Sequence, residues 1–260
     1  MSQYRGVFAL LILALAPPVV AAEPGFRSLF NGRDLGGWEG VTSEAAQSWR
    51  VADGAIVCTG EKGTWLRSRQ QYGDFNFRFE YKLKPGGNSG IYVRVPADGA
   101  HREGGGVEVQ LLDDAAERYR DIKPGQFGGS VYLVAPATQH VARPAGEWNT
   151  MEIDCVGTSY RITHNGVVIV DANGREFPEL AQRFTTGYLG LQNHSEEVWF
   201  RNLRIGPPQA NGVAISSCSP SAACCGRRRN TRIKVGKFSL HGMVNRAINS
   251  SRPRKSARAW

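Results

Sequence analysis

The sequence predicts an all-β protein folded as a two-sheet antiparallel β-sandwich. Strand-like patterns recur about every ten residues along the chain, with Gly or Pro residues between them. The chain contains 31 Gly and 13 Pro, which is typical of a fold with many turns and long rim loops. No long segment keeps a helical period, so the pattern indicates strands rather than helices.

Two segments give the clearest strand signals. In DFNFRFEYKLK, alternate residues from Phe75 to Leu83 are apolar and those between them are polar, which predicts a strand with one buried and one solvated face. In YRITHNGVVIVD, Asn165 and Gly166 tolerate the positive φ angles of a tight turn, so a hairpin is expected. The helix candidates, 114–121 and 177–184, are about two turns each and are expected to decorate loops.

Residues 1–22 have the features of a secretory signal peptide. Arg5 precedes an apolar stretch, and small residues stand before a cleavage site after Ala22. A membrane anchor is the weaker alternative, because Pro17 and Pro18 interrupt a stretch already shorter than the roughly 20 residues of a span. We therefore expect a secreted or periplasmic protein without a transmembrane segment.

The positive charge of the chain is concentrated in its C-terminal part. Residues 207–260 contain eleven Lys and Arg and no acidic residue, so subtracting eleven from the formal charge of +9 leaves −2 for residues 1–206. We expect one domain at 23–206, with no charge pattern that favours nucleic acid, followed by a disordered basic tail. A gene-boundary artefact is the alternative for the tail. Its three cysteines lack the paired spacing of a zinc site.

The domain itself contains two cysteines, Cys58 and Cys155, each in an apolar strand pattern. In an exported protein the two thiols can form a disulfide. Two buried free thiols fit the same pattern, because free Cys is among the most buried residue types. The sequence leaves both alternatives open.

The densest polar residues lie on three strand-like runs, which are NSGIYVR (88–94), VEVQLLDD (107–114) and LGLQNH (189–194). Because alternate side chains of a strand point to the same face, each run offers one apolar and one hydrogen-bonding face. The hydrogen-bonding faces carry Asn88, Tyr92 and Arg94 on the first run, Glu108 and Gln110 on the second, and Gln192 and His194 on the third. Val95 is expected on the apolar face, with Ile91 and Val93.

Seven segments of the domain form a recognisable series. They are FRSLFNGRDLGGWEG, WRVADGAIVCTGEKGTWLRS, YGDFNFRFEYKLKPGGNSGIYVR, VEVQLLDD, GSVYLVAPA, GEWNTMEIDCVGTSYRITHNGVVIVD and GYLGLQNHSEEVWFRNLRI. In this order, from about Phe26 to Ile205, they resemble the 3-keto-disaccharide hydrolase domain. The resemblance implies a concanavalin A-like jelly roll, a fold shared with many lectins and glucanases.

The resemblance also implies a sugar substrate whose C3 hydroxyl has been oxidised to a ketone by a separate sugar 3-dehydrogenase. That ketone acidifies the C2 proton, so a base can remove it, the aglycone can leave C1, and water can add to complete a net hydrolysis. An ordinary glycosidase instead needs two carboxylates roughly 5 to 10 Å apart. Here Glu108 shares its face with Gln110 and Leu112, while Asp113 should point away. One carboxylate beside an amide favours proton abstraction.

Glu108 and His194 are therefore the candidates for acid–base catalysis. Arg94 is expected to keep Glu108 ionised and to bind the enolate-like oxygen that develops on C2 deprotonation. The alternatives are a purely structural ion pair between Glu108 and Arg94, and a surface role for His194.

Sugar hydroxyls are expected to bind side chains that both donate and accept hydrogen bonds. The amide candidates are Asn88, Gln110 and Gln192, and the aromatic candidates for stacking on a sugar are Tyr92, Tyr132 and Trp65. Trp38, Trp49 and Trp148 are expected to fill the core.

Two further questions stay open at this point. Glu108 and His194 with another oxygen donor can hold a divalent metal ion, although no spacing motif demands one. His101 and His164 are not expected to contribute.

The rival function is a non-catalytic, lectin-like carbohydrate-binding module, which the same polar face can serve. The titratable pair favours the enzyme.

Overall fold

A computed structural model describes residues 23–42, 44–61, 64–97 and 105–209. The predicted signal peptide, His101 and all but the first three residues of the predicted tail lie outside the described residues. Among the residues that are described, no helix is long and apolar enough to cross a membrane.

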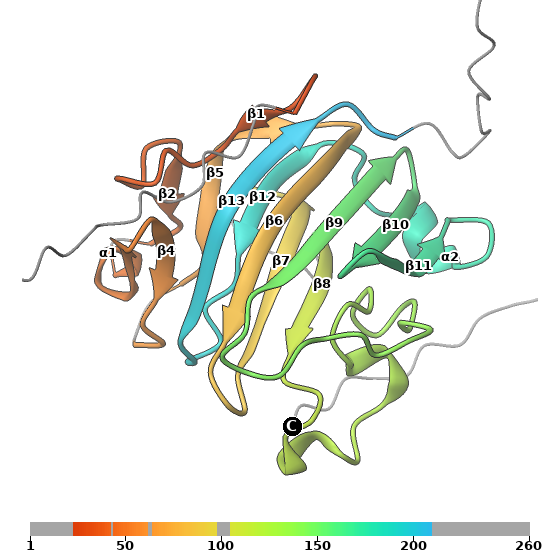
Figure 1. The fold of residues 1–260 in the computed structure, drawn as a ribbon. Helices are drawn as coiled ribbons and strands as arrows, with labels where there is room; N and C mark the ends of the chain where they lie inside the picture. Colours follow the sequence, from red (N-terminus) through yellow and green to blue (C-terminus); the bar gives the residue numbers. More distant parts are fainter. Residues whose placement is uncertain (1–22, 43, 62–63, 98–104, 210–260) are drawn as a thin grey trace, which may run out of the picture. The chain divides into compact units, whose positions relative to one another are not determined.

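The fold consists of two antiparallel sheets packed face to face, which confirms the predicted sandwich (Figure 1). The larger sheet has the strand order β11-β10-β9-β6-β13-β4-β3, with β1 paired to β13, and the smaller has the order β2-β5-β12-β7-β8. The strands of the larger sheet are β1 (Arg27–Ser28), β3 (Trp49–Ala52), β4 (Ala55–Cys58), β6 (Phe75–Leu83), β9 (Asn149–Val156), β10 (Ser159–His164), β11 (Val167–Ala172) and β13 (Val198–Gly206). Those of the smaller are β2 (Trp38–Gly40), β5 (Leu66–Tyr72), β7 (Asn88–Val95), β8 (Val107–Leu112) and β12 (Gly187–Leu191).

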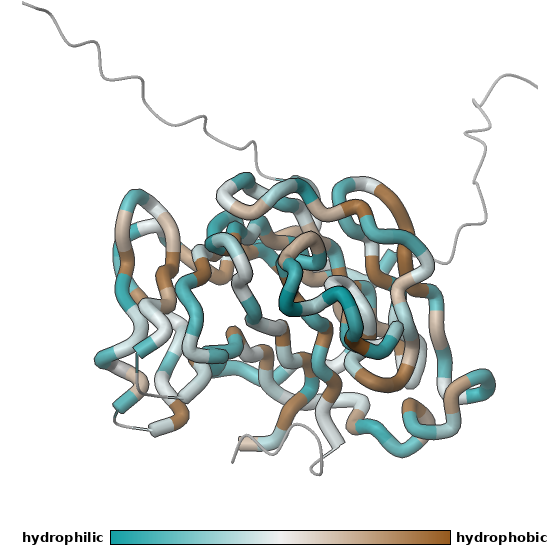
Figure 2. The backbone as a smooth tube through the Cα atoms, turned by 90° about the horizontal axis from the view of Figure 1, so that it is seen from below, coloured by the Kyte–Doolittle hydropathy of each residue, from teal (hydrophilic) through white to brown (hydrophobic). Residues whose placement is uncertain are grey.

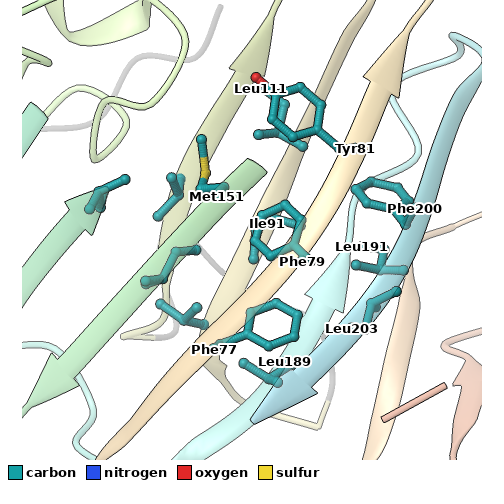
Figure 3. Close-up of a cluster of buried hydrophobic side chains, with 14 of the residues drawn as sticks. Phe77, Phe79, Tyr81, Ile91, Leu111, Met151, Leu189, Leu191, Phe200 and Leu203 are labelled. Carbon is teal, nitrogen blue, oxygen red and sulfur yellow. The ribbon is translucent and has the colours of Figure 1, made fainter. Parts of the chain in front are cut away.

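The core lies between the sheets and is built from the apolar faces that the alternation predicts. Phe77 and Phe79 of β6 are buried with Ile91 of β7 and Leu191 of β12 (Figure 3). Fully burying each such side chain contributes about 1.5–3 kcal/mol. Hydrophobic and hydrophilic positions are interspersed along the chain, as strands with one buried face require (Figure 2).

The predicted turns and loop decorations are present. Asn165 and Gly166 have φ angles of +47° and +83° and join β10 to β11, which confirms the hairpin. The short helices are α1 (Ala45–Ser48), η1 (Glu117–Tyr119), η2 (Pro124–Gln126) and α2 (Pro178–Ala181). Of these, η1 and α2 fall within the two segments predicted to be helical.

The two domain cysteines are both buried and free. Cys58 lies on β4 and Cys155 on β9, which are not neighbouring strands of the sheet. Burial raises the pKa of Cys58 to about 11 and that of Cys155 to about 12. Of the two alternatives, the structure has the free thiols.

A β-bulge in β7 overturns the expected position of Arg94. Tyr92 pairs with Gly190 and Val95 with Tyr188, so β7 has one more residue than β12 between these two pairs. Arg94 takes a φ of +55°, and its side chain leaves the face of Tyr92. Val95 takes its place there and packs with Trp65 and Tyr92. The prediction that Arg94 shares a face with Glu108 is therefore wrong.

Arg94 instead has a structural environment between the sheets. Its side chain is fully buried, with an ion pair to Asp74 at 3.0 Å and a hydrogen bond to the Gly73 carbonyl at 3.0 Å. The guanidinium also lies beside the rings of Phe75 and Tyr160, 5.7 and 5.6 Å from their centroids. These contacts satisfy a charge that would otherwise be costly to bury.

The expectation for one tryptophan is also wrong. Trp38 and Trp49 are buried in the core, but Trp148 is half-buried outside it. Its ring lies 3.9 Å from the Arg201 guanidinium and 5.2 Å from the Lys82 ammonium. Trp148 directly precedes β9, where it packs against long cationic side chains rather than against the apolar interior.

The buried His164 predicts a pH-dependent stability. Its Nε2 lies 3.0 Å from the Tyr81 hydroxyl, and burial lowers its pKa from 6.5 to about 4. Between these values the unfolded chain binds a proton that the folded protein does not, so stability falls as the pH drops from about 6.5 to about 4. We expect the wild-type free energy of unfolding to fall over this range by about 3 kcal/mol more than that of His164→Gln, as measured by urea denaturation.

The exposed His194 provides the control. His194→Gln should lose as much stability as the wild type over this range, because it keeps the buried His164. Equal losses for the wild type and His164→Gln would show that His164 does not resist protonation in the folded protein.

Candidate active site

The strand register brings the predicted polar side chains together on the outer face of the small sheet. Tyr92 of β7 lies opposite Glu108 of β8, and Gly90 lies opposite Gln110. The backbone N–H of Gln192, just after β12, donates to the Gly90 carbonyl at 2.9 Å. Because the intervening residues of these strands point into the core, the polar residues must point outward. We call this surface of Asn88, Tyr92, Glu108, Gln110 and Gln192 the polar face.

Gln192 is the centre of the hydrogen-bond network on the polar face. Its Nε2 donates to Glu108 Oε1 at 2.8 Å and to the Tyr92 hydroxyl at 2.7 Å. The Ser89 hydroxyl donates to the Gln192 carbonyl at 2.9 Å, which fixes its backbone. Gln192 Oε1 is buried and accepts no hydrogen bond from the described residues. It is therefore an acceptor available to a ligand hydroxyl.

The amide pair beside this network is looser. Gln110 Nε2 donates to Asn88 Oδ1 at 3.3 Å. Both amides keep further donor and acceptor capacity, since each side chain has four hydrogen-bonding positions. They extend the polar face along β7 and β8 away from Tyr92.

Gly90 forms the floor between Glu108 and Gln192. A Cβ at this position would lie 3.0 Å from Glu108 Oε1 and 3.1 Å from Gln192 Oε1. Such distances are closer than ordinary van der Waals contact. The missing side chain therefore lets both oxygens lie close over the strand at Gly90.

The polar groups at this floor are almost fully shielded by the protein. Glu108 is 7% exposed, Gln192 7% and Gln110 4%. A carboxylate removed from water is costly unless it accepts hydrogen bonds, and the Gln192 amide supplies one. Glu108 is therefore oriented rather than freely rotating.

Tyr132 lies next to Glu108, in a short segment that extends the small sheet beyond β8. Its backbone N–H donates to the Glu108 carbonyl at 2.9 Å. Gln126 Nε2 donates to the Tyr132 hydroxyl at 3.1 Å. Gln126 was not among the predicted site residues. It lies in the 3-10 turn η2, where the alternation of polar and apolar residues gives no signal.

An aromatic wall borders the polar face on the other side. The ring of Trp65 lies edge-on to Tyr92, with centroids 5.3 Å apart. Gly190 makes room for it, since a Cβ there would lie 2.3 Å from Trp65 Cε3. Trp65 is only 9% exposed, so little of its ring is available for stacking on a sugar.

Arg67 extends this wall. It was also not among the predicted site residues. It lies opposite Gly190 in the sheet, forms an ion pair with Glu39, and stacks over Tyr188 at 4.5 Å. The hydrogen bond from Arg67 lowers the pKa of Glu39. Alternation could have predicted it, because Arg67 in β5 lies two residues after Trp65, the residue just before that strand, so both side chains point to the same face.

His194 lies away from this network. It is exposed in the loop between β12 and β13, and it forms no hydrogen bond or ion pair within the described part of the chain. The same loop carries Glu196, which pairs with Lys84 at 2.7 Å and Arg118 at 3.1 Å. Burial tends to raise the pKa of Glu196, but the hydrogen bonds from these two cations outweigh burial and lower it.

The described residues contain no group of three or more His, Cys, Asp or Glu side chains able to hold a metal ion. Glu108 and His194 are thus not gathered with a third such ligand in the ranges that the structure covers.

Comparison with known proteins agrees with this architecture. The 3-keto-alpha-glucoside-1,2-lyase-like domain family matches residues 25–206. A protein of Bacteroides thetaiotaomicron named 3-keto-disaccharide hydrolase is 25% identical, in a match that covers 70% of this chain and 78% of that protein.

Solved structures from Parabacteroides distasonis, named as candidate glycosyl hydrolases, share the fold. One has a TM-score of 0.61 at 24% identity, covering 70% of this chain and 98% of its own. Another has a TM-score of 0.54 at 25% identity, covering 71% and 84%. The family match spans most of the chain and agrees with the resemblance seen in the sequence. The chain therefore belongs to the 3-keto-alpha-glucoside-1,2-lyase-like domain family.

Proposed function

We propose that this protein is an exported enzyme that cleaves 3-keto-glycosides by removing the C2 proton, with elimination of the aglycone followed by hydration. The observation that carries the proposal is a single shielded carboxylate, Glu108, set among amides and a tyrosine on the polar face. Membership of the family supports the substrate class.

The number of carboxylates favours elimination over ordinary glycoside hydrolysis. Strands β7, β8 and β12 contain one acidic residue, Glu108. A retaining or inverting glycosidase needs a second carboxylate across the scissile bond. A substrate that already carries a C3 ketone needs one base, because its C2–H bond is acidified by the neighbouring carbonyl.

The proposed reaction balances without an oxidant or a reductant. Glu108 takes the C2 proton, the C2–H electrons form the C1–C2 double bond, and the C1–O bond to the aglycone breaks. The aglycone oxygen takes a proton and leaves. Glu108 releases its proton to solvent, which replaces the proton taken by the aglycone. Water then adds its oxygen to C1 and a solvent proton adds to C2, so the sum is hydrolysis.

The network around Gln192 suits this first step. Its Nε2 holds Glu108 Oε1 and the Tyr92 hydroxyl, while its Oε1 lies close over Gly90 and accepts no hydrogen bond from the described residues. A sugar hydroxyl that reaches Gln192 Oε1 can donate to it. This contact would place the adjacent C–H bond against the carboxylate, and such positioning supplies much of the rate acceleration in enzymes.

Two further roles belong to the proposal. Tyr92 replaces Arg94 as the donor to the enolate-like oxygen, because it is hydrogen-bonded to Gln192 beside Glu108 whereas Arg94 is buried with Asp74. His194 stays the candidate that gives a proton to the leaving oxygen, since it follows Gln192 by two residues in the loop after β12. Asn88 and Gln110 are proposed to bind other hydroxyls.

Export, the concanavalin A-like jelly-roll assignment and a separate sugar 3-dehydrogenase are also parts of the proposal. Export depends on the pattern of residues 1–22, and N-terminal sequencing of the secreted protein would test it. The concanavalin A-like jelly-roll assignment is supported by strands that are neighbours in sequence, such as β5 and β6, lying in different sheets. A separate dehydrogenase is required by the chemistry, because a 3-keto sugar must be made by oxidation.

Glu108→Gln tests the assignment of the base. The amide keeps the size of the side chain but cannot accept the C2 proton, so kcat on 3-keto-trehalose should fall about 100-fold or more. Glu80→Gln, on the outer face of the large sheet, is the matched control and should keep wild-type kcat. Aglycone release from the keto sugar and from its unoxidised parent is measured in parallel, with and without a chelator.

Two results would contradict the proposal. Equal cleavage of the unoxidised parent would remove the role of the ketone. No release from either sugar, together with saturable binding of both, would make the domain a carbohydrate-binding module.

Gly90→Ala tests the close packing of Glu108 and Gln192 over Gly90. The new methyl group would approach Glu108 Oε1 and Gln192 Oε1 to about 3 Å and would displace both side chains, so we expect kcat/KM of the folded variant to fall at least about tenfold. Gly73→Ala is the control, because its Cβ would lie 3.6 Å from the nearest side-chain atom, Thr186 Oγ1. Unchanged kcat/KM in Gly90→Ala would place the substrate elsewhere.

A further inference from the structure

The long connection between β8 and β9 lines an open cavity of about 660 Å³. This connection is the green segment at the end of the sandwich in Figure 1. The residues that line the cavity are Asp113, Asp114, Ala115, Ala116, Phe127, His140, Ala142, Arg143, Pro144 and Ala145. None of its lining residues belongs to the polar face. Its volume falls in the range of pockets that bind small molecules.

One wall of the cavity is polar and ordered by hydrogen bonds. Asp114 Oδ1 accepts the Gly128 N–H at 2.8 Å, and its Oδ2 lies 3.2 Å from His140 Nδ1. The side chain of Asp114 is 13% exposed and that of His140 is 52% exposed. Because Nδ1 is engaged by Asp114, the Nε2 atom of His140 is left to meet a ligand.

Neighbouring groups add a second carboxylate and a cation. Asp113 Oδ2 accepts the Gly86 N–H at 2.7 Å, and its other oxygen has no partner among the described residues. Arg143 uses one amino group on the Trp148 carbonyl at 3.2 Å. The lining therefore mixes two carboxylates with an arginine and a histidine, and neither sign of charge dominates.

The rest of the lining is apolar. The ring of Phe127 meets the ring of His140 edge-on, with centroids 4.7 Å apart and planes at 74°. The other apolar lining residues are small, namely Ala115, Ala116, Ala142, Pro144 and Ala145. An aromatic ring among small side chains leaves room for a flat apolar surface to pack against it.

We propose that this cavity is an ancillary saccharide-binding pocket, separate from the polar face. Sugars present hydroxyls that both donate and accept, together with C–H faces that pack on aromatic rings. The carboxylates suit the sugar's donors, and so does His140 Nε2, which accepts in a neutral ring whose Nδ1–H donates to Asp114. The remaining Arg143 groups suit the sugar's acceptors, and Phe127 suits its C–H face. The mixed charge disfavours a strongly anionic or cationic ligand.

A simpler role for the pair of Asp114 and His140 is a clasp between two loops. A clasp alone would contribute to stability and would not bind a ligand. The two roles are therefore separated by measuring binding and Tm on the same variants.

The test is calorimetric titration of the full secreted protein with maltose, cellobiose, laminaribiose and trehalose, each in its unoxidised form. We expect at least one of them to bind with one-to-one stoichiometry. Asp114→Asn and His140→Gln should each weaken that binding about tenfold or more, which corresponds to about 1.4 kcal/mol. Asp121→Asn, whose side chain is 87% exposed in the same connection, is the matched control and should bind normally.

Glu108→Gln shows which site binds the sugar. Binding that survives Glu108→Gln and is weakened by Asp114→Asn supports the pocket. Three results would overturn it: no binding of any of the four sugars, binding lost only in Glu108→Gln, or Asp114→Asn and His140→Gln variants that lose Tm but keep affinity. The titrations do not measure turnover of keto sugars. A negative result would therefore overturn the pocket without bearing on the proposed catalysis, which the turnover of Glu108→Gln tests.

Discussion

The pleat of three neighbouring strands is the constraint on which the candidate site depends. Ile91, Val109 and Leu191 are fully buried between the sheets, and their burial fixes the register of β7, β8 and β12. A slip of one residue in any strand would turn its polar face into the core, and in β8 it would bury Glu108 there. The same apolar packing that stabilises the sandwich therefore places the carboxylate, the tyrosine and the glutamine side by side. The geometry of the site and the packing of the core therefore depend on the same strand register.

The alternation of polar and apolar residues predicted the two faces of these strands. It could not predict the position at which a bulge interrupts the alternation. The bulge at Arg94 reverses the side-chain direction, and a non-glycine residue with positive φ gives no reliable sequence signal. The strain at Arg94 is offset by its ion pair with Asp74 and its contacts between the sheets. Contacts made from loops were harder still to predict. Gln126 contacts Tyr132 from a 3-10 turn, and Trp148 packs against Arg201 at the end of a strand. Both depend on tertiary contacts that no local period encodes.

The small sheet concentrates its polar chemistry in one place, whereas the outer face of the large sheet disperses it. There, ion pairs such as Arg201 with Glu80 link half-exposed side chains at the surface, where such pairs contribute about 1 kcal/mol or less. On the polar face a shielded carboxylate accepts a hydrogen bond from an amide whose own oxygen lies close over a glycine. A buried acceptor beside an oriented base is costly for stability, and such arrangements are typical of binding and catalytic sites.

The central claim is that the C2–H bond breaks before the aglycone leaves, and turnover in D₂O tests it most directly. The released 3-keto sugar is examined by NMR at early times, beside the same sugar incubated without enzyme to correct for spontaneous exchange. The account predicts solvent deuterium at C2 in every molecule of product, because water supplies the proton that returns to that carbon. Product released with its original C2 hydrogen would show direct displacement at C1 and would contradict the account.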